Sequence, residues 1–556
     1  MTHRRIPLQL AVWLTVLLAV VGWGAGQHPA VRSTEPFALT EVTVIDGTGA
    51  PPRPSQTVLV ANGRIAAIDE ARTWTPPEQV RVIRGRGRYL IPGLWDMHVH
   101  LSMGDPSLLP VFLAHGVTAV RDLGGDFPTV RAWQQEIAAG TRIGPRIYTA
   151  GRILESPRFL EILARLAGAL EPPFRDRINA IRTERIPVSD AEQVERAVRD
   201  LAQQGATCIK FRMNTTPEIF HAIVTAANRV GLPVAGHSPQ GVSLAEAAAA
   251  GQKSFEHVLT GPEEATLPLA EIDRFADALQ QNRSYLVPTL VTFHTSRLLA
   301  PKLMDERLNA LSQPRKSRSR SLPEPLVEAW RLQRRLDQFE PPQDWAAVYR
   351  GAVERLRHLH RAGALFLAGT DFGARFIYPG SSLHEELERL VVEIGLTPGE
   401  ALQTATRNAA QFFREEQRLG TIEVGKLADL VLLEANPLDD IRNTRRIAAV
   451  IAAGVYYNRA ALERLSARTP SRQSNLDFFR PGRGIYRWRA YVPSPPPTAG
   501  TAFDPEIALD HTCSVGTTDT APLDSHGNRQ FLRRSGTCGL HCRFTRTVAS
   551  AAARRR

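Results

Sequence analysis

The sequence predicts an α/β protein: a (β/α)8 TIM-like barrel joined to a small β-sandwich domain that is built from both flanks of the barrel. Three observations predict this class. Strand-like and helix-like segments alternate through the middle of the chain, as a parallel barrel requires. Histidine, lysine or aspartate stands where five of the apolar runs end, and such barrels collect their active sites at the carboxyl ends of the strands. Short β-like runs flank the alternating region on both sides.

Composition fits a large globular protein and excludes one class of partner. The chain has 556 residues and is 43% hydrophobic, which is enough to bury a sizeable core. The net charge of +12 is spread along the chain and rises at residues 314–320 and in the C-terminal tail. Such runs are usually solvated surface, and no compact basic face with interleaved aromatic residues is present. The sequence therefore predicts no nucleic-acid binding.

Residues 1–27 are typical of an export signal. Arg4 and Arg5 precede an apolar run, residues 8–21, and the small residues 24–26 offer a cleavage zone. The same region is just long enough to cross a bilayer as an uncleaved anchor. In both cases the body of the protein is expected to be exported, either periplasmic or secreted, with membrane contact only if the segment stays uncleaved.

The flanks of the barrel are predicted to share one domain. Residues 36–89 and residues 420–460 each contain short β-like runs broken by Gly, Asn and Pro. Because the ends of a domain usually lie close together, the two segments are expected to form the two halves of the β-sandwich. The barrel itself is assigned to residues 90–419.

The most informative stretch is residues 90–101, LIPGLWDMHVHL, which we expect to form one strand. In a strand, residues two apart project from the same face, so the imidazoles of His98 and His100 aim at one point. That is the arrangement of two ligands of one metal ion. Taken alone the motif is weak, because two histidines in a strand are often packed or solvated.

Four further residues strengthen the metal hypothesis. Each stands at the end of an apolar, strand-like run and is followed by a polar or glycine-rich loop: Lys210, His237, His257 and Asp371. In a barrel these strand ends meet at one mouth.

Each candidate ligand also has an ordinary structural interpretation. The histidines could be core residues, Lys210 could form a salt bridge, and Asp371 could cap a helix. Their placement at strand ends favours the ligand roles. Arg121 and Asp122, which end the second strand, are expected to brace the barrel mouth. The remaining prominent histidines are expected to be packing or surface residues: His115, His221, His358, His360 and His384.

Several ordered motifs carry a family resemblance, among them LIPGLWDMHVH, GVTAVRDLGG, GATCIKF, AGTDFG and GTIEVGKLADLVLLEANPLDDI. Over about residues 36–459 the chain resembles the amidohydrolase superfamily, in the branch of imidazolonepropionase-related and prolidase-like hydrolases. The resemblance implies a distorted barrel that binds divalent metal ions, usually zinc, beside a β-sandwich.

The resemblance also implies a role for each site residue. It assigns one metal ion to His98, His100 and Asp371, and a second to His237 and His257. Lys210 would bridge two metal ions after carboxylation by CO2, since a free ammonium has no lone pair to offer. Burial beside cations favours the neutral amine that reacts with CO2.

These parts imply hydrolysis of a C–N bond. A hydroxide shared by two metal ions is a nucleophile at neutral pH, and Asp371 can take its proton and return it to the leaving nitrogen. We therefore predict an exported, metal-dependent amidohydrolase acting on a small amide or dipeptide, with an Xaa-Pro dipeptidase as one form. A lactonase or ester hydrolase on the same site, or a non-catalytic binding protein on a retained barrel, are the alternatives. A homo-oligomer stays open.

Two regions depart from the family pattern. After the third strand, AGRILESPRFLEIL replaces a loop that is often rich in glycine and histidine, and residues 153–187 look helical and carry no chemical signal. Residues 476–556 are expected to be a disordered tail. The tail holds Cys513, Cys538 and Cys542, whose odd number favours incidental chemistry over a disulfide or metal pair. Cys208 is expected to be a small buried residue.

Overall fold

The computed structural model describes residues 35–168, 172–212, 215–311, 322–337 and 342–467. The predicted export signal, the basic run at 314–320 and the tail with its three cysteines lie outside these residues. Within the described part of the chain, no helix combines the length and the apolar character needed to cross a membrane.

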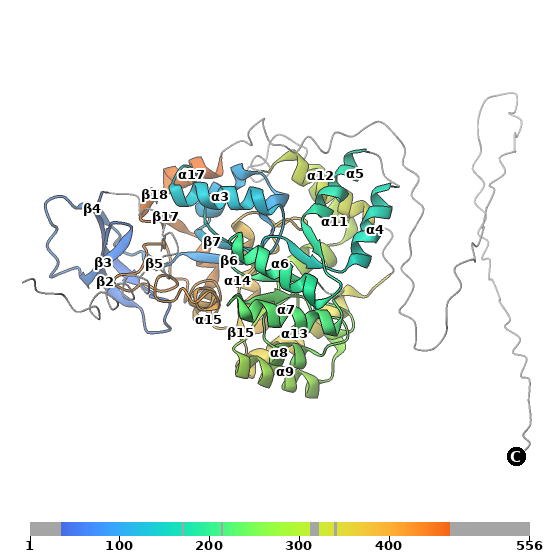
Figure 1. Cartoon of the computed structure of the whole chain (residues 1–556). Helices are drawn as coiled ribbons and strands as arrows, with labels where there is room; N and C mark the ends of the chain where they lie inside the picture. Colours follow the sequence, from blue (N-terminus) through green and yellow to red (C-terminus); the bar gives the residue numbers. More distant parts are fainter. Residues whose placement is uncertain (1–34, 169–171, 213–214, 312–321, 338–341, 468–556) are drawn as a thin grey trace, which may run out of the picture. The chain divides into compact units, whose positions relative to one another are not determined.

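The centre of the chain is a ring of parallel strands (Figure 1). Three of them pair side by side: β6 (Leu94–Val99), β7 (Val117–Asp122) and β8 (Arg146–Thr149). Seven more form a second sheet in the order β10-β9-β11-β12-β13-β14-β15. Their bounds are β9 Ile153–Glu155, β10 Arg185–Pro187, β11 Ile209–Phe211, β12 Val234–Gly236, β13 Gln252–Glu256, β14 Tyr285–Val287 and β15 Leu365–Phe366.

Two junctions close the two sheets into one barrel. On one side Val99 pairs in parallel with Phe372, which lies beyond β15. On the other side β8 and β9 are successive pieces of the third barrel strand. The amide of Thr207, just before β11, donates a hydrogen bond to the carbonyl of Thr149, at the end of β8, at 2.8 Å. The predicted barrel is therefore confirmed.

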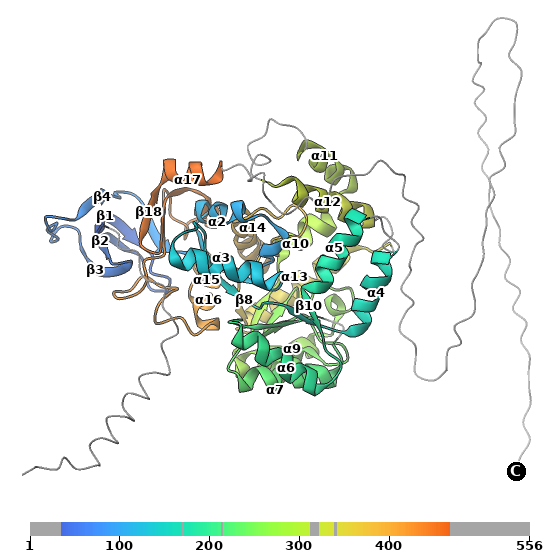
Figure 2. The same ribbon diagram turned by 45° about the horizontal axis from the view of Figure 1, so that its top comes forward.

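Helices follow the strands and pack against the ring (Figure 2). The helix α6 shows why they form: its buried residues Val194, Ala197, Val198 and Leu201 recur every three or four positions, and Asp190 caps its first turn. The α-helices are α2 Leu109–Ala114, α3 Phe127–Ala139, α4 Pro157–Gly168, α5 Pro172–Thr183, α6 Ala191–Gln203, α7 Pro217–Arg229, α8 Leu244–Ala250, α9 Leu269–Asn282, α10 Leu290–Phe293, α11 Pro301–Leu311, α12 Glu324–Leu336, α13 Trp345–Arg361, α14 Ser381–Arg389, α15 Pro398–Thr404, α16 Arg407–Phe412 and α17 Arg459–Ser466.

Both flanks of the barrel contribute to one β-rich domain, as predicted, but its strands form one mixed sheet and not one half of a sandwich from each flank. Its strand order is β18-β17-β16-β5-β1-β2-β3, and β4 pairs with β1. The N-terminal flank supplies β1 Phe37–Val44, β2 Arg53–Ala61, β3 Arg64–Glu70, β4 Arg81–Arg84 and β5 Tyr89–Pro92, and the C-terminal flank supplies β16 Leu430–Leu433, β17 Ile447–Ala452 and β18 Val455–Asn458. Apolar residues of both flanks share one buried cluster, which includes Leu39, Val58 and Leu432.

Two details of the sequence prediction were wrong. Residues 90–101 form two strands, not one: β5 belongs to the mixed sheet and β6 to the barrel, and the chain divides at Gly93. A Cβ atom at Gly93 would lie 2.1 Å from the Thr118 hydroxyl oxygen, so no side chain fits at this crossing. Residues 153–187 are not wholly helical either, because they contain the barrel strand β9 and its neighbour β10.

Candidate active site

The six predicted ligands lie at the carboxyl ends of five barrel strands. His98 is in β6 and His100 follows it, Lys210 is in β11, and His237 and His257 come directly after β12 and β13. Asp371 follows the short strand β15. Folding thus brings together residues that are up to 273 positions apart in the sequence, between His98 and Asp371.

Short distances connect these side chains. Asp371 Oδ1 lies 3.5 Å from His98 Nε2 and 3.4 Å from His100 Nε2. The ring of His257 is 4.6 Å from that of His98 and 5.2 Å from that of His237, measured between centroids.

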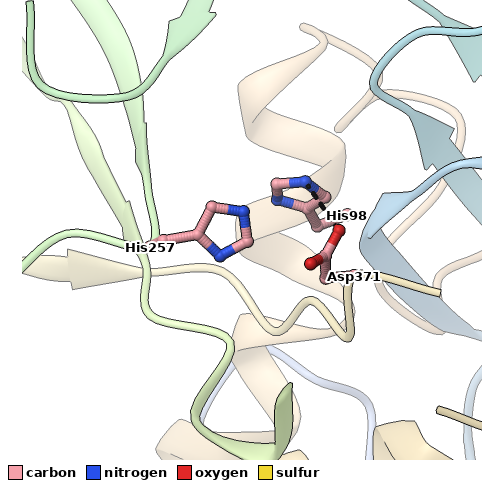
Figure 3. Close-up of side chains that lie close together, drawn as sticks. All are labelled: His98, His257 and Asp371. Atoms are coloured by element: carbon pink, nitrogen blue, oxygen red, sulfur yellow. Dashed lines mark ion pairs between the residues drawn. The ribbon is translucent and has the colours of Figure 1, made fainter. Parts of the chain in front are cut away.

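Three of the residues form a compact set of metal-ligand type. The ligand atoms of His98, His257 and Asp371 all lie within 4.8 Å of one another (Figure 3). This set combines His98 and Asp371, which the resemblance assigns to one metal ion, with His257, which it assigns to the other. The two predicted ligand sets therefore adjoin each other in space.

Three of the four histidines are held by their Nδ1 atoms, which leaves Nε2 to face the site. His98 Nδ1 donates to Glu256 at 2.8 Å, and His100 Nδ1 donates to the Gly124 carbonyl at 2.9 Å. His257 Nδ1 is 2.6 Å from Thr289 Oγ1, which itself donates to the Pro288 carbonyl and so accepts from the ring. A ring that donates through Nδ1 keeps a lone pair on Nε2, as a metal ligand must.

Two of the six candidate ligands have a buried nitrogen atom without a hydrogen-bond partner among the described residues: His98 Nε2 and Lys210 Nζ. Lys210 is 2% exposed. Burial, the main cause, lowers the pKa of its amine to about 8, so a neutral amine is within reach near neutral pH. Unsatisfied buried nitrogen atoms are rare in native proteins. Both atoms, and the donor set around them, fit a site built for metal ions and for a carboxylated lysine.

The comparisons decide the family. Residues 89–456 match the model described as the Amidohydrolase family. The chain belongs to the amidohydrolase family. The resemblance stated from the sequence motifs is thereby confirmed.

Individual relatives of this amidohydrolase agree with that assignment. The ochratoxinase of Aspergillus niger is 26% identical over 459 residues, which cover 74% of this chain and 84% of that protein. The structure of a bottromycin amidohydrolase is 25% identical, covers 82% of this chain and 96% of its own, and has a TM-score of 0.58. A Xaa-Pro dipeptidase with bound methionine shares the fold, with a TM-score of 0.56, 23% identity, and coverage of 76% and 100%.

The family makes this protein a hydrolase that acts on carbon–nitrogen bonds. This finding favours the enzyme over the non-catalytic binding protein that the sequence also allowed. Amidohydrolases generally bind divalent metal ions, and the cluster of His98, His257 and Asp371 is a group that could hold one.

Beneath the ligands of this amidohydrolase lies a network of which the sequence analysis predicted only Arg121. Glu256 receives hydrogen bonds from His98, from Arg121 Nη2 at 2.8 Å and from Ser254 Oγ at 2.6 Å. Burial raises the pKa of the Glu256 carboxyl, but the positive charge of Arg121 and the bond from His98 outweigh it and hold that pKa well below its usual range. The carboxylate therefore fixes the orientation of His98.

A second buried carboxylate supports the strand that carries His98. Asp96 accepts hydrogen bonds from the Thr370 hydroxyl at 2.6 Å and the Thr370 amide at 3.0 Å, next to Asp371. Burial raises the pKa of Asp96 to about 7. Asp371 also donates its own amide to the His98 carbonyl at 2.7 Å, so the two ligands are tied through the backbone.

Asp371 and His257 both have left-handed backbone, with a φ of 56° each. Such a conformation is uncommon for residues other than glycine and tends to occur at functional sites. The backbone at these two positions therefore has a conformation that the local sequence alone does not favour.

Four other residues that the sequence singles out are buried: Arg121, Asp122, His384 and Cys208. Arg121 is buried and donates to the Met97 carbonyl and to Ser254, and Asp122 accepts from the Leu101 amide, so both brace the mouth as expected. His384 is buried and bonded to Thr444, a packing role. Cys208 is buried, as predicted.

Proposed function

We propose that the protein is an exported, metal-dependent amidohydrolase that cleaves the amide bond of a dipeptide or similar small molecule. The observation that carries this proposal is the common orientation of the histidines. Three rings donate through Nδ1 to the surrounding protein and turn Nε2 toward a space shared with Asp371 and the unpartnered amine of Lys210.

The donor set suits two divalent cations, for which zinc is the proposed identity. His98, His100 and Asp371 would hold one, and His237 and His257 the other. Lys210 would bridge them as its carbamate. Bound there, the cations would supply a nucleophile from water at neutral pH and polarise the substrate carbonyl.

Asp371 is the proposed catalytic residue. Burial alone would raise the pKa of its carboxyl, but the neighbouring imidazoles, His257 first, lower it below its usual range. The group is therefore an available proton acceptor at neutral pH. It takes a proton from the attacking water and gives it to the leaving nitrogen as the C–N bond breaks.

The substrate class follows from the relatives. Similarity to ochratoxinase over most of both chains, together with family membership, supports an amide substrate, and an Xaa-Pro dipeptide is one proposed form. The same site can attack an ester or a lactone, so both belong in the substrate screen. Export is proposed from Arg4, Arg5 and the apolar run that follows them.

The proposal is tested by elemental analysis of the protein without residues 1–27, prepared with bicarbonate. We expect close to two metal equivalents in the parent and a sharp fall in Lys210→Ala, because a carbamate needs the amine. Lys302→Ala, which removes an exposed lysine of α11, is the matched control and should keep both equivalents.

One equivalent in both proteins, or none, would contradict the binuclear site. The same preparations are then screened against dipeptides, N-acyl amino acids and lactones. Hydrolysis of lactones without any cleavage of amides would replace the amide substrate by an ester.

A further inference from the structure

A second cluster of charged residues lies at the barrel mouth, beside the proposed metal site. Glu155 is the last residue of β9, and Arg212 comes directly after β11. The two strands are neighbours, since Phe211 pairs with Leu154. Glu155 and Arg212 therefore stand side by side, at the carboxyl ends of their strands.

Arg212 points to the same side of its strand as Lys210. Phe211, between them, packs outward on Phe220 of α7, with 5.6 Å between ring centroids. Because side chains alternate along a strand, Lys210 and Arg212 both point inward. Two residues of strand correspond to about 7 Å, so Arg212 lies about that far above Lys210, toward the mouth.

The guanidinium of Arg212 is held from two sides. Its Cζ atom lies 5.4 Å from the ring centre of Phe159, in α4, and its Nε lies 3.6 Å from Glu155 Oε2. Glu155 also lies 3.7 Å from Arg185 Nε, so it is shared between two arginines. The side chain of Arg212 is 32% exposed, whereas that of Glu155 is 1% exposed.

The terminal nitrogens of Arg212 are available. Among the described residues, no side chain or carbonyl accepts a hydrogen bond from its Nη1 or Nη2. The guanidinium is held in place by Phe159 and Glu155, and its two terminal nitrogens are free to donate. Such a group is well suited to bind a carboxylate through two parallel hydrogen bonds.

We propose that Arg212 is a specificity-determining residue that binds the free carboxylate of the substrate. This inference rests on the proposed amide hydrolysis and narrows its substrates to dipeptides and N-acyl amino acids over neutral amides. Phe159 and Glu155, from the segment that departs from the family pattern, are positioning residues for that arginine. α4 lies beside α5 at this end of the barrel (Figure 2).

The test compares a substrate that has a free carboxylate with the same substrate in which that carboxylate is a neutral amide. The values of kcat/KM are measured for N-acetyl-L-phenylalanine and for N-acetyl-L-phenylalanine amide, with the metal-loaded parent and with Arg212→Gln. We expect the parent to prefer the acid, and the variant to lose about 10- to 100-fold on the acid while changing little on the amide, since a hydrogen-bonded charge pair contributes that much. Arg158→Gln, an exposed arginine next to Phe159, is the matched control and should behave as the parent.

Calorimetric binding of the products, L-phenylalanine and its amide, gives a readout that needs no bond cleavage. A preference for the acid that Arg212→Gln abolishes supports the inference, even if no amide is hydrolysed and the proposed function fails. Equal binding of acid and amide by the parent, or binding of neither, overturns it. So does an equal loss on both substrates in the variant.

Discussion

Two layers of polar side chains inside the barrel differ in whether their atoms have partners. In the inner layer, defined as Asp96, Arg121, Ser254 and Glu256, each side chain makes at least two hydrogen bonds. In the outer layer of candidate ligands, His98 Nε2 and Lys210 Nζ have none. A satisfied network makes a site rigid, and buried atoms without partners are tolerated where a ligand completes them. The inner layer therefore positions the site, and the outer layer supplies the atoms that could bind a ligand.

The largest effect is expected in the outer layer, from Asp371→Asn. Asparagine keeps the shape but cannot accept and return a proton, so kcat for an amide substrate should fall about 1000-fold, within the usual range for general acid–base catalysis. Asp344→Asn, at the exposed cap of α13, is the control and should keep full activity. Activity within tenfold of the parent would remove Asp371 from the chemistry.

A loss of stability is expected in the inner layer, from Glu256→Gln. The change leaves the buried Arg121 without its counter-charge, so the free energy of unfolding should fall by about 3–5 kcal/mol. Urea denaturation of chelator-treated protein measures it. Glu70→Gln, which breaks an exposed pair with Arg72, should cost no more than about 0.5 kcal/mol. Equal losses in the two variants would mean that the inner layer is not a stabilising network.

The smallest expected effect is an increase in the free energy of unfolding, and it comes from Lys210→Met. The folded-state pKa of Lys210 is lowered to about 8, so between about pH 8 and pH 10.5 the unfolded chain binds more protons than the folded one. The stability of the metal-free parent should therefore rise with pH across that window, by about 3 kcal/mol in total. Lys210→Met, which removes the buried amine, should be more stable at pH 7 by about 2 kcal/mol.

The difference between parent and variant is the decisive quantity in that experiment. It should fall from about 2 kcal/mol to zero and then reverse sign as the pH rises from about 8 to 10.5, and the exposed Lys302→Met should show no such trend. A difference that stays constant with pH would mean that Lys210 keeps its ordinary pKa in the folded protein.

The outer layer could be predicted from the sequence, whereas Arg121 was the one residue of the inner layer that the sequence predicted. His98, Lys210 and Asp371 stand at the ends of apolar runs, where a barrel gathers its strands, so their convergence follows from fold class. Glu256 gave a weaker signal: with Ser254 it alternates along the mostly polar strand β13, QKSFE, but alternation does not tell which partner, here Arg121, lies opposite.

Short elements explain the other errors. β9 and β10 have three residues each, too few to show a period of two, so the segment looked helical. Glu155 was overlooked for that reason. The break at Gly93 was hidden because apolar residues stand directly on both sides of it, and only the approach of Thr118 reveals that the chain changes sheets there.

That crossing at Gly93 also bears on when the site can form during synthesis. β5 leads directly into β6, which carries His98, and β5 pairs with β16, so that Leu90 is opposite Leu432. Contacts between such distant parts of the chain form slowly, because a long loop must close first. β5, which leads into the strand of the first histidine, therefore lacks its neighbour β16 until the C-terminal flank has left the ribosome. A nascent chain that ends within the barrel would carry its candidate metal ligands beside an incompletely paired sheet.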